Sequence, residues 1–430
     1  MIYLIKNRLR SFLFKNMDKQ EIKVFSLLSA AFFFIIGAYW TIRSLKNAIL
    51  KDTVGVSSIP TAKKLSVVAI ICLLLVYSKL VDRIPKHRLF FIVCTFYSAC
   101  FFTIAYLFSN QGFVNPSWLG FASYSIIESF GSVVVALFWT LVATTVDISS
   151  AKRGYAVVFA SGQIGALLGT TLVTKAEFFG IPMLICISAT IALFIPRIIK
   201  KFVMTSCKSK PACVTKKPAK TGLLEGVRLL ATKPYLLGIF AIVAMYEIVV
   251  TIFDFQMQIL ANQEYGTAAY AAFNAFYGQL VTIIACMFAF FGTRFFIKKF
   301  GFRFCLTFFP IVVASLVCYF YMFPSLWAAL TGMVTIKALS YGFNNPVKEI
   351  IYLPTSDDIK FKAKSWIEMF GNRSSKAGGA TINGVLSDIP QGFVTYGLII
   401  SLSVVGVWLM VALLMGGAFS RLVKKQRVVK

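Results

Sequence analysis

Long hydrophobic runs dominate the chain, and polar residues gather in the short segments between them. A helix needs roughly twenty apolar residues to cross the hydrocarbon core of a bilayer. We identify runs of about this length on both sides of a Lys- and Pro-rich break at 208–222. The predicted spans are 24–50, 65–81, 89–108, 118–146, 155–174, 180–198, 235–260, 270–297, 303–323, 325–346, 366–386 and 393–416. The pattern predicts an all-α membrane protein with twelve transmembrane helices in two six-helix bundles.

The composition agrees with this interpretation. Of the 430 residues, 58% are hydrophobic and 14% are charged, whereas soluble domains are about 45–50% apolar and about 25% charged. The predicted domains are a cytoplasmic amphipathic N-terminus (1–23), an N-terminal six-helix bundle (24–200), a basic cytoplasmic linker (201–234), a C-terminal six-helix bundle (235–416) and a basic cytoplasmic tail (417–430).

The net charge of +28 could indicate a nucleic-acid partner. Most of the basic residues lie in short loops, however, where they mark the cytoplasmic side of a membrane. Basic loops follow the even-numbered spans, and the loops after the odd spans are mostly poor in charge. The first loop is an exception, with Lys51, Lys63 and Lys64. The distribution places both termini in the cytoplasm, and we expect no nucleic-acid partner.

The two halves of the chain echo each other. Residues 147–169 line up with 358–380 at an offset of 211 residues, which pairs Asp147 with Asp358 and Arg153 with Lys364. Two halves with an even number of spans indicate a parallel duplication. This predicts a major-facilitator-like architecture with the substrate site at mid-membrane between the halves. We expect the four paired residues to contribute to gating.

A second cytoplasmic feature supports this architecture. The segment SKLVDRIPKH (78–87) resembles the major-facilitator loop pattern G-x-x-x-D-R-x-G-R-R, with both glycines replaced. We expect its Asp82 and Arg83 to latch helix ends at the cytoplasmic gate.

Charged residues inside predicted spans are costly unless they face a cavity or a partner. In the first span, Arg43, Lys46 and Asn47 share one helix face, and they form either a cationic patch for phosphate or a pair of cations that snorkel to the interface. Glu128 in the fourth span is a proton carrier or the partner of a cation. A purely structural ion pair of Glu128 with Lys46 or Lys376 is the alternative.

The second half carries three more polar stripes. Their residues are Glu247, Thr251, Asp254 and Gln258 in span seven, Lys337, Tyr341, Asn344 and Lys348 in span ten, and Glu368, Asn372, Arg373 and Lys376 in span eleven. Lysines interleaved with an aromatic ring and an amide suit a nucleobase and phosphates, and they suit helix packing equally well. Gly378 and Gly379 allow a close approach of helices.

Catalytic chemistry is not indicated. The nine cysteines are scattered, His87 is the single histidine, and the sequence shows no Ser-His-Asp, Cys-His or metal-ligand constellation. The segment GNRSSK (371–376) lacks the G-K-[ST] ending of a phosphate loop. We therefore expect neither enzymatic activity, nor a cofactor, nor a metal.

Several blocks carry a resemblance to a known family. The segments IRSLKNAIL (42–50), IIESFGSVVVALFWTLVATTVDISSAKRGY (126–155) and NNPVKEIIYLPTSDDIKFKAKSWIEMFGNRSSKAGGA (344–380) follow its L-R-x-L-K-D, E-x-x-G-S-V-V…F-W…A-K-R-x-Y and P-T-K-E…G-G-R-x-G-K-S-G-G patterns. The chain thus resembles the bacterial and plastid ATP/ADP translocases. The resemblance implies four functional charges, at Lys46, Glu128, Asp254 and Lys376. The chain departs from the patterns at Asp254, where the family usually has Glu, and at Asn47, where it usually has Asp.

The resemblance implies a carrier of ATP, ADP or related nucleotides that works by alternating access, either as an exchanger or as a proton-coupled importer. We expect a monomer in a bacterial inner membrane, with the lipid bilayer and protons as further partners. Two alternatives stay open, namely a proton-coupled major facilitator for another organic anion or a peptide, and a membrane protein that does not transport. The expected substrate-binding residues are Arg43, Lys46, Glu128, Asp254, Lys337, Tyr341, Asn345, Lys348, Arg373 and Lys376.

Overall fold

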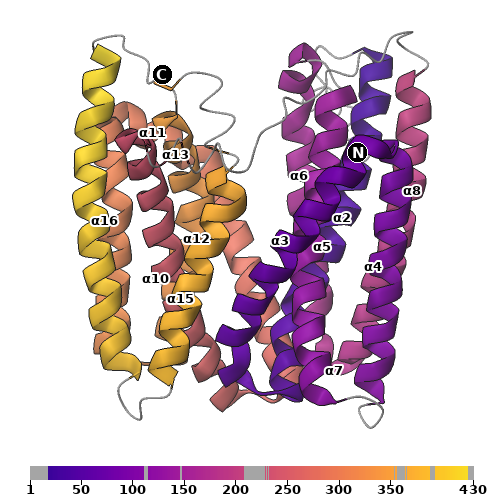
Figure 1. The fold of residues 1–430 in the computed structure, drawn as a ribbon, viewed down its shortest axis with the longest axis horizontal. Helices are drawn as coiled ribbons and strands as arrows, with labels where there is room; N and C mark the ends of the chain where they lie inside the picture. Colours follow the sequence, from indigo (N-terminus) through magenta and orange to yellow (C-terminus); the bar gives the residue numbers. More distant parts are fainter. Residues whose placement is uncertain are drawn as a thin grey trace, which may run out of the picture. The chain divides into compact units, whose positions relative to one another are not determined.

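The computed structural model is almost entirely helical (Figure 1). It describes residues 18–110, 115–145, 148–207, 228, 230, 232–352, 354–355, 364, 366–387 and 393–424. Most of the predicted N-terminus and linker, and the last six residues of the predicted tail, therefore lie outside the described residues. The last predicted helix of each half runs further than expected, because α8 ends at Cys207 and α16 ends at Lys424.

The described chain divides into two compact units. Unit 1 takes the described residues of Met1–Val54, Val68–Pro218 and Thr267–Gln279, and unit 2 takes those of Gly55–Val67, Ala219–Gly266 and Leu280–Lys430. The domain boundaries expected from the sequence stay a prediction.

Unit 1 is built around its first helix, α2 (Lys19–Thr53), which packs against α5 (Pro116–Thr145), α6 (Ile148–Val173) and α8 (Ile181–Cys207). The unit is completed by α4 (Lys86–Ser109), α7 (Ala176–Phe179), most of α3 (Ile59–Arg83) and the first turns of α11 (Thr267–Met322). A Cβ added at Gly165 of α6 would lie 2.3 Å from the carbonyl oxygen of Phe33 in α2. The backbones of α2 and α6 therefore approach closely, as small residues allow in membrane bundles.

Unit 2 is built around α10 (Pro234–Glu264), which packs against α12 (Leu326–Leu339), α15 (Asn372–Ser387) and α16 (Phe393–Lys424). The start of α3, the short helix η1 (Val56–Ser58), the rest of α11 and α13 (Asn345–Ile351) complete it. A Cβ added at Gly379 would lie 2.9 Å from the Cβ of Thr251, and Asn383 donates a buried hydrogen bond of 2.9 Å to the Thr251 carbonyl. These contacts fix α15 against α10.

Nine helices in the described part of the chain are long and apolar enough to cross a membrane, and a tenth, Val157–Val173, is apolar but shorter. The predicted spans 325–346 and 366–386 are also helical, but each is interrupted by a π-helical turn, η3 (Ser340–Asn344) and η4 (Ile367–Gly371). The all-α membrane fold is confirmed, and the count of twelve stays a prediction.

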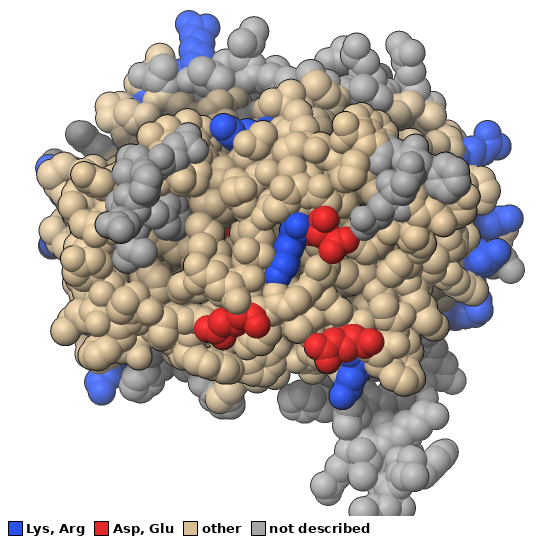
Figure 2. Space-filling view, turned by 90° about the horizontal axis from the view of Figure 1, so that it is seen from below, with Lys and Arg blue, Asp and Glu red and all other residues tan. Residues whose placement is uncertain are grey.

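The long helix α11 shows how one residue separates two predicted spans. Gly301 has φ 79° and ψ 165° inside it. This backbone conformation is essentially restricted to glycine, so the helix breaks there between the runs at 270–297 and 303–323. Figure 2 shows the end of the molecule that lies at the bottom of Figure 1. Its surface is mostly uncharged, with acidic side chains near the middle, some of them against a basic side chain, and further basic side chains along the rim.

Candidate substrate site

The central charges of unit 1 form a compact ion pair. The Nζ atom of Lys46 on α2 donates a hydrogen bond of 2.5 Å to Oε2 of Glu128 on α5, and the two side chains are 11% and 20% exposed. The same ammonium lies 4.6 Å from the centroid of the Tyr124 ring. Of the alternatives open for Glu128, the structure shows pairing with Lys46, and in this conformation Lys46 does not snorkel to an interface.

Two further cations of unit 1 lie against aromatic rings. The guanidinium of Arg43 is 4.8 Å from the Trp40 ring, and the Lys51 ammonium is 4.9 Å from the Tyr270 ring. A ring face attracts a cation without neutralising it. Arg43 lies one turn before Lys46 on the same helix, as the spacing predicts.

Lysines of unit 2 gather around one buried carboxylate, Glu247 of α10. Oε2 of Glu247 lies 3.8 Å from Nζ of Lys376 on α15. The ammonium groups of Lys337 and Lys348 lie 5.5 Å and 5.6 Å from the ring of the adjacent Tyr246. Glu247 thus interacts electrostatically with Lys376 of α15, Lys337 of α12 and Lys348 of α13, and with Lys63 as well.

Glu247 itself is 7% exposed, and its Oε2 has no hydrogen-bond partner within the described protein. The sequence placed this residue on a polar stripe but did not identify it as a site residue. The signal was present, because a carboxylate in an apolar run is a functional candidate by default.

Asp254, two turns further along α10, has a partner of its own. Its Oδ2 accepts a hydrogen bond of 2.7 Å from Nζ of Lys63, and the two side chains are 24% and 18% exposed. The assignment of Lys63 to a charged outer loop was wrong. Helix α3 begins at Ile59, so Lys63 is a helical residue that packs within unit 2.

The two π-helical turns lie beside the lysine cluster. Turn η3 falls between Lys337 and Lys348, and η4 ends immediately before the segment that carries Arg373 and Lys376. Such turns are rare and are frequent at functional sites. The extra residue in the turn shifts the register of span ten, which a continuous α-helical pattern does not predict.

The shift separates the residues expected to share one stripe of span ten. Tyr341 is 42% exposed, whereas Asn344 is 2% exposed and its Nδ2 has no hydrogen-bond partner within the described protein. Asn345 and Arg373 are half-buried. Lys337 and Lys348 still meet at Tyr246.

Of the predicted gating residues, Lys364 can be described fully. It donates a hydrogen bond of 2.7 Å to Glu349 and lies 3.8 Å from Glu368, both of which are more than half exposed. Asp147 and Asp358 lie outside the described residues, and so do the side chains of Asp82, Arg83 and Arg153.

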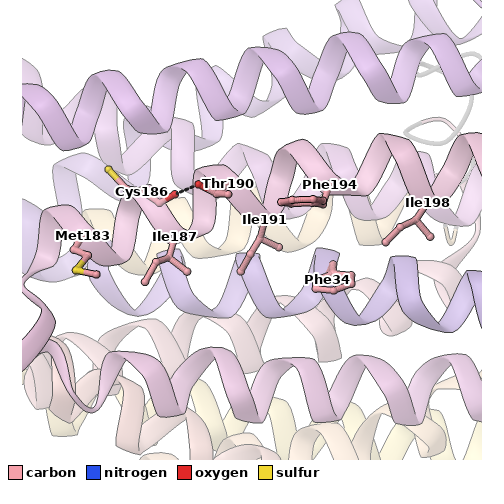
Figure 3. A pocket seen from close by; sticks show the side chains of 8 residues that line it. All are labelled: Phe34, Met183, Cys186, Ile187, Thr190, Ile191, Phe194 and Ile198. Carbon is pink, nitrogen blue, oxygen red and sulfur yellow. Dashed lines mark hydrogen bonds between the residues drawn. The ribbon is translucent and has the colours of Figure 1, made fainter.

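A separate groove on unit 1 is unsuited to a nucleotide. It has a volume of about 550 Å³ and lies between α8 and Phe34 of α2 (Figure 3). Its lining is apolar apart from Cys186 and Thr190, and the Thr190 hydroxyl donates to the Cys186 carbonyl. The groove offers no charged group to orient a phosphate.

The helical architecture is the all-α, major-facilitator-like fold that the sequence predicts. Two solved structures share this fold: nucleoside transporter NupG aligns with a TM-score of 0.65, 14% identity and coverage of 92% of this chain and 99% of that chain. A bacterial homologue of the iron transporter ferroportin, in the inward-facing state, aligns with a TM-score of 0.69, 10% identity and the same coverages.

The family follows from the sequence match. The model of the TLC ATP/ADP transporter family matches residues 4–118, 111–336 and 322–419. The chain belongs to this family, and the resemblance noted in its motifs is confirmed. Among its curated relatives, ADP,ATP carrier protein 1 of Rickettsia prowazekii is 24% identical over 429 residues, which cover 85% of this chain and 86% of the relative.

Proposed function

We propose that the protein moves ATP, ADP or related nucleotides across a bacterial inner membrane by alternating access. The observation that carries this proposal is a cluster of cations in unit 2, where Lys337, Lys348 and Lys376 all interact electrostatically with Glu247, and Lys348 interacts with two further carboxylates as well. Uncompensated charges in a medium of low dielectric constant are costly. A polyanionic substrate supplies the missing negative charge.

The phosphates of the substrate are the natural ligands of these side chains. An ammonium or guanidinium donates charge-assisted hydrogen bonds to phosphate oxygens, which are about twice as strong as neutral ones. In this proposal Arg43, Lys46, Lys348, Arg373 and Lys376 hold phosphates, with Lys337 beside them. Tyr341 and Asn345 contact the base or the ribose.

The paired carboxylates have a different role. Glu128 holds Lys46, and Asp254 holds Lys63, each through a short ion pair. An arriving phosphate competes with either carboxylate for its cation, so the pairs exchange partners during the cycle. A carrier whose cations lack an anion reorients poorly, which favours exchange over net transport. Proton uptake by Glu128 or Asp254 is the route to net import.

The name of the Rickettsia relative, ADP,ATP carrier protein 1, supports the adenine nucleotides as substrates. The charge distribution of the loops supports cytoplasmic termini. In this account the monomer is the transporting unit, and Lys364 with the other predicted gating residues closes the cytoplasmic side.

Uptake into liposomes tests the proposal. Purified protein is reconstituted, and entry of labelled ATP, GTP, CTP, UTP and NAD is measured with and without internal nucleotide. We expect ATP uptake that internal ADP or ATP accelerates, and no uptake in protein-free liposomes. A pH-driven uptake of another organic anion that nucleotides do not inhibit would refute nucleotide transport.

A further inference from the structure

We propose that Glu247 is an internal counter-anion that competes with the substrate phosphates for the lysines of unit 2 and so sets the preference between ATP and ADP. This inference rests on the proposed function and deepens it. Glu247 belongs neither to the four charges that the family resemblance implies nor to the residues expected from the sequence.

The carboxylate of Glu247 is largely buried. Its side chain is 9% exposed, and its Oε2 has no hydrogen-bond partner within the described protein. A buried charge that lacks hydrogen bonds is costly. Here the surrounding cations offset that cost, because Lys376, Lys337, Lys348 and Lys63 all act electrostatically on Glu247.

Glu247 lies close to Lys376 without a hydrogen bond to it. The distance from Oε2 to Nζ of Lys376 is 3.8 Å, which exceeds hydrogen-bond length. The Lys376 side chain is 41% exposed, so the ammonium remains accessible while the carboxylate lies behind it. Lys376 is therefore partly neutralised and can still accept a phosphate.

The two helices that carry this pair, α10 and α15, are closely packed. Gly379 presses against Thr251 and the carbonyl of Ile248, and Asn383 bonds to the Thr251 carbonyl. The Gly379 contact holds α15 against α10 within a turn of the ion pair, and the Asn383 hydrogen bond does so two turns from Lys376. Asp254 differs from Glu247, because its Oδ2 accepts a hydrogen bond of 2.7 Å from Nζ of Lys63.

The consequence concerns substrate charge. At neutral pH ATP carries about one negative charge more than ADP, so a fixed carboxylate at this place repels ATP more strongly than ADP. At a separation of several ångströms and an intermediate effective dielectric constant, one charge pair changes an affinity by about tenfold. Glu247 thus weakens the binding of ATP relative to the binding of ADP, and it speeds the release of ATP.

Binding of ATP and of ADP to the purified full-length protein tests the inference by titration calorimetry. We expect Glu247→Gln to raise the ratio of ATP affinity to ADP affinity by about tenfold and to slow exchange in liposomes. Glu247→Asp keeps the charge and is expected to stay near the wild-type ratio. The matched control is Glu264→Gln, which removes an exposed carboxylate from the end of the same helix and leaves the ratio unchanged.

An unchanged ratio in Glu247→Gln, with wild-type protein that binds both nucleotides, overturns the inference and leaves the proposed function intact. A wild-type protein that binds no nucleotide refutes both. If Glu247→Gln does not fold, the double variant Glu247→Gln with Lys376→Gln restores the local charge balance. We expect that variant to bind both nucleotides more weakly than the wild type, with a ratio near the wild-type value, and a ratio raised about tenfold above the wild type contradicts the inference.

Discussion

The two units share a plan and differ in how their charges are balanced. In each unit the first helix of the repeated half, α2 or α10, packs against a Gly-containing helix, α6 or α15. In unit 1 the buried Lys46 meets one carboxylate at hydrogen-bond distance. In unit 2 Lys337, Lys348 and Lys376 interact electrostatically with Glu247, and Nζ of Lys376 lies 3.8 Å from its Oε2. Unit 1 thus carries a paired lysine and carboxylate, and unit 2 carries a cluster of lysines around one buried carboxylate.

This difference assigns different tasks to the two regions. A compensated pair holds its helices together until a competitor arrives, so it is suited to switching. A cluster of several lysines around one buried carboxylate attracts a further anion, so it is suited to binding phosphate. Substitutions that alter the charge balance in one region at a time separate the two tasks.

The largest expected effect follows from breaking the pair of unit 1. Glu128→Gln leaves Lys46 without its anion, and loss of one partner of a buried pair costs about 3 kcal/mol. We expect a clearly lower midpoint of thermal unfolding in detergent. The double variant Lys46→Gln with Glu128→Gln is expected to recover most of the loss, and Glu177→Gln, at an exposed site of the same unit, is the control. A single variant as stable as the wild type would mean that the pair is not a compensated unit.

The second prediction removes a cation from the cluster of unit 2. Lys376→Gln is expected to weaken ATP binding by roughly 10- to 100-fold, because a hydrogen bond to a charged group contributes about 1.5–3 kcal/mol. The thermal stability of the variant should change little, because the remaining lysines still interact electrostatically with Glu247. Titration with ATP checks the affinity, and Lys424→Gln at the exposed end of α16 is the control. Unaltered ATP affinity would argue against phosphate binding at this cluster.

The third prediction compares a glycine at a close helix contact, Gly165, with a glycine that faces open space, Gly378. Gly165→Ala forces a Cβ against the Phe33 carbonyl and is expected to destabilise the protein by about 1–3 kcal/mol. Gly378→Ala meets no atom within 4 Å, so the helix propensity of alanine should leave the stability unchanged or slightly higher. Thermal unfolding of both variants measures the contrast. Equal midpoints would show that the close approach of α2 and α6 is not tightly constrained.

The smallest expected effect concerns the partly exposed pair of Lys63 and Asp254. Lys63→Gln is expected to change the exchange rate by roughly two- to fivefold, because this pair is more exposed than Lys46–Glu128 and water solvates part of the charge that is left on Asp254. Lys63→Arg should preserve the rate. The neighbouring Lys64→Gln serves as the control, and an equal effect of both glutamine variants would remove any special role of Lys63.

The hydrophobic runs predicted the helices, because span length is a local property of a sequence, and the motif blocks at 42–50, 126–155 and 344–380 indicated the family. Lys46 and Glu128 were identified for the same reason, since each stands out in an apolar run. Their pairing, the lysine cluster around Glu247 and the Lys63–Asp254 pair depend on contacts between distant helices. The π-helical turns at 340–344 and 367–371 also change which side chains share a face, and a regular helical period does not reveal them.

The central claim is that the lysine cluster of unit 2 recognises phosphates, and a titration series tests it most directly. ATP, ADP, AMP and adenosine are titrated into the purified wild-type protein and into Lys376→Gln. The account predicts that wild-type affinity increases with the number of phosphates, and that the increase is smaller in the variant. Adenosine that binds as tightly as ATP, with no difference between the two proteins, would contradict it.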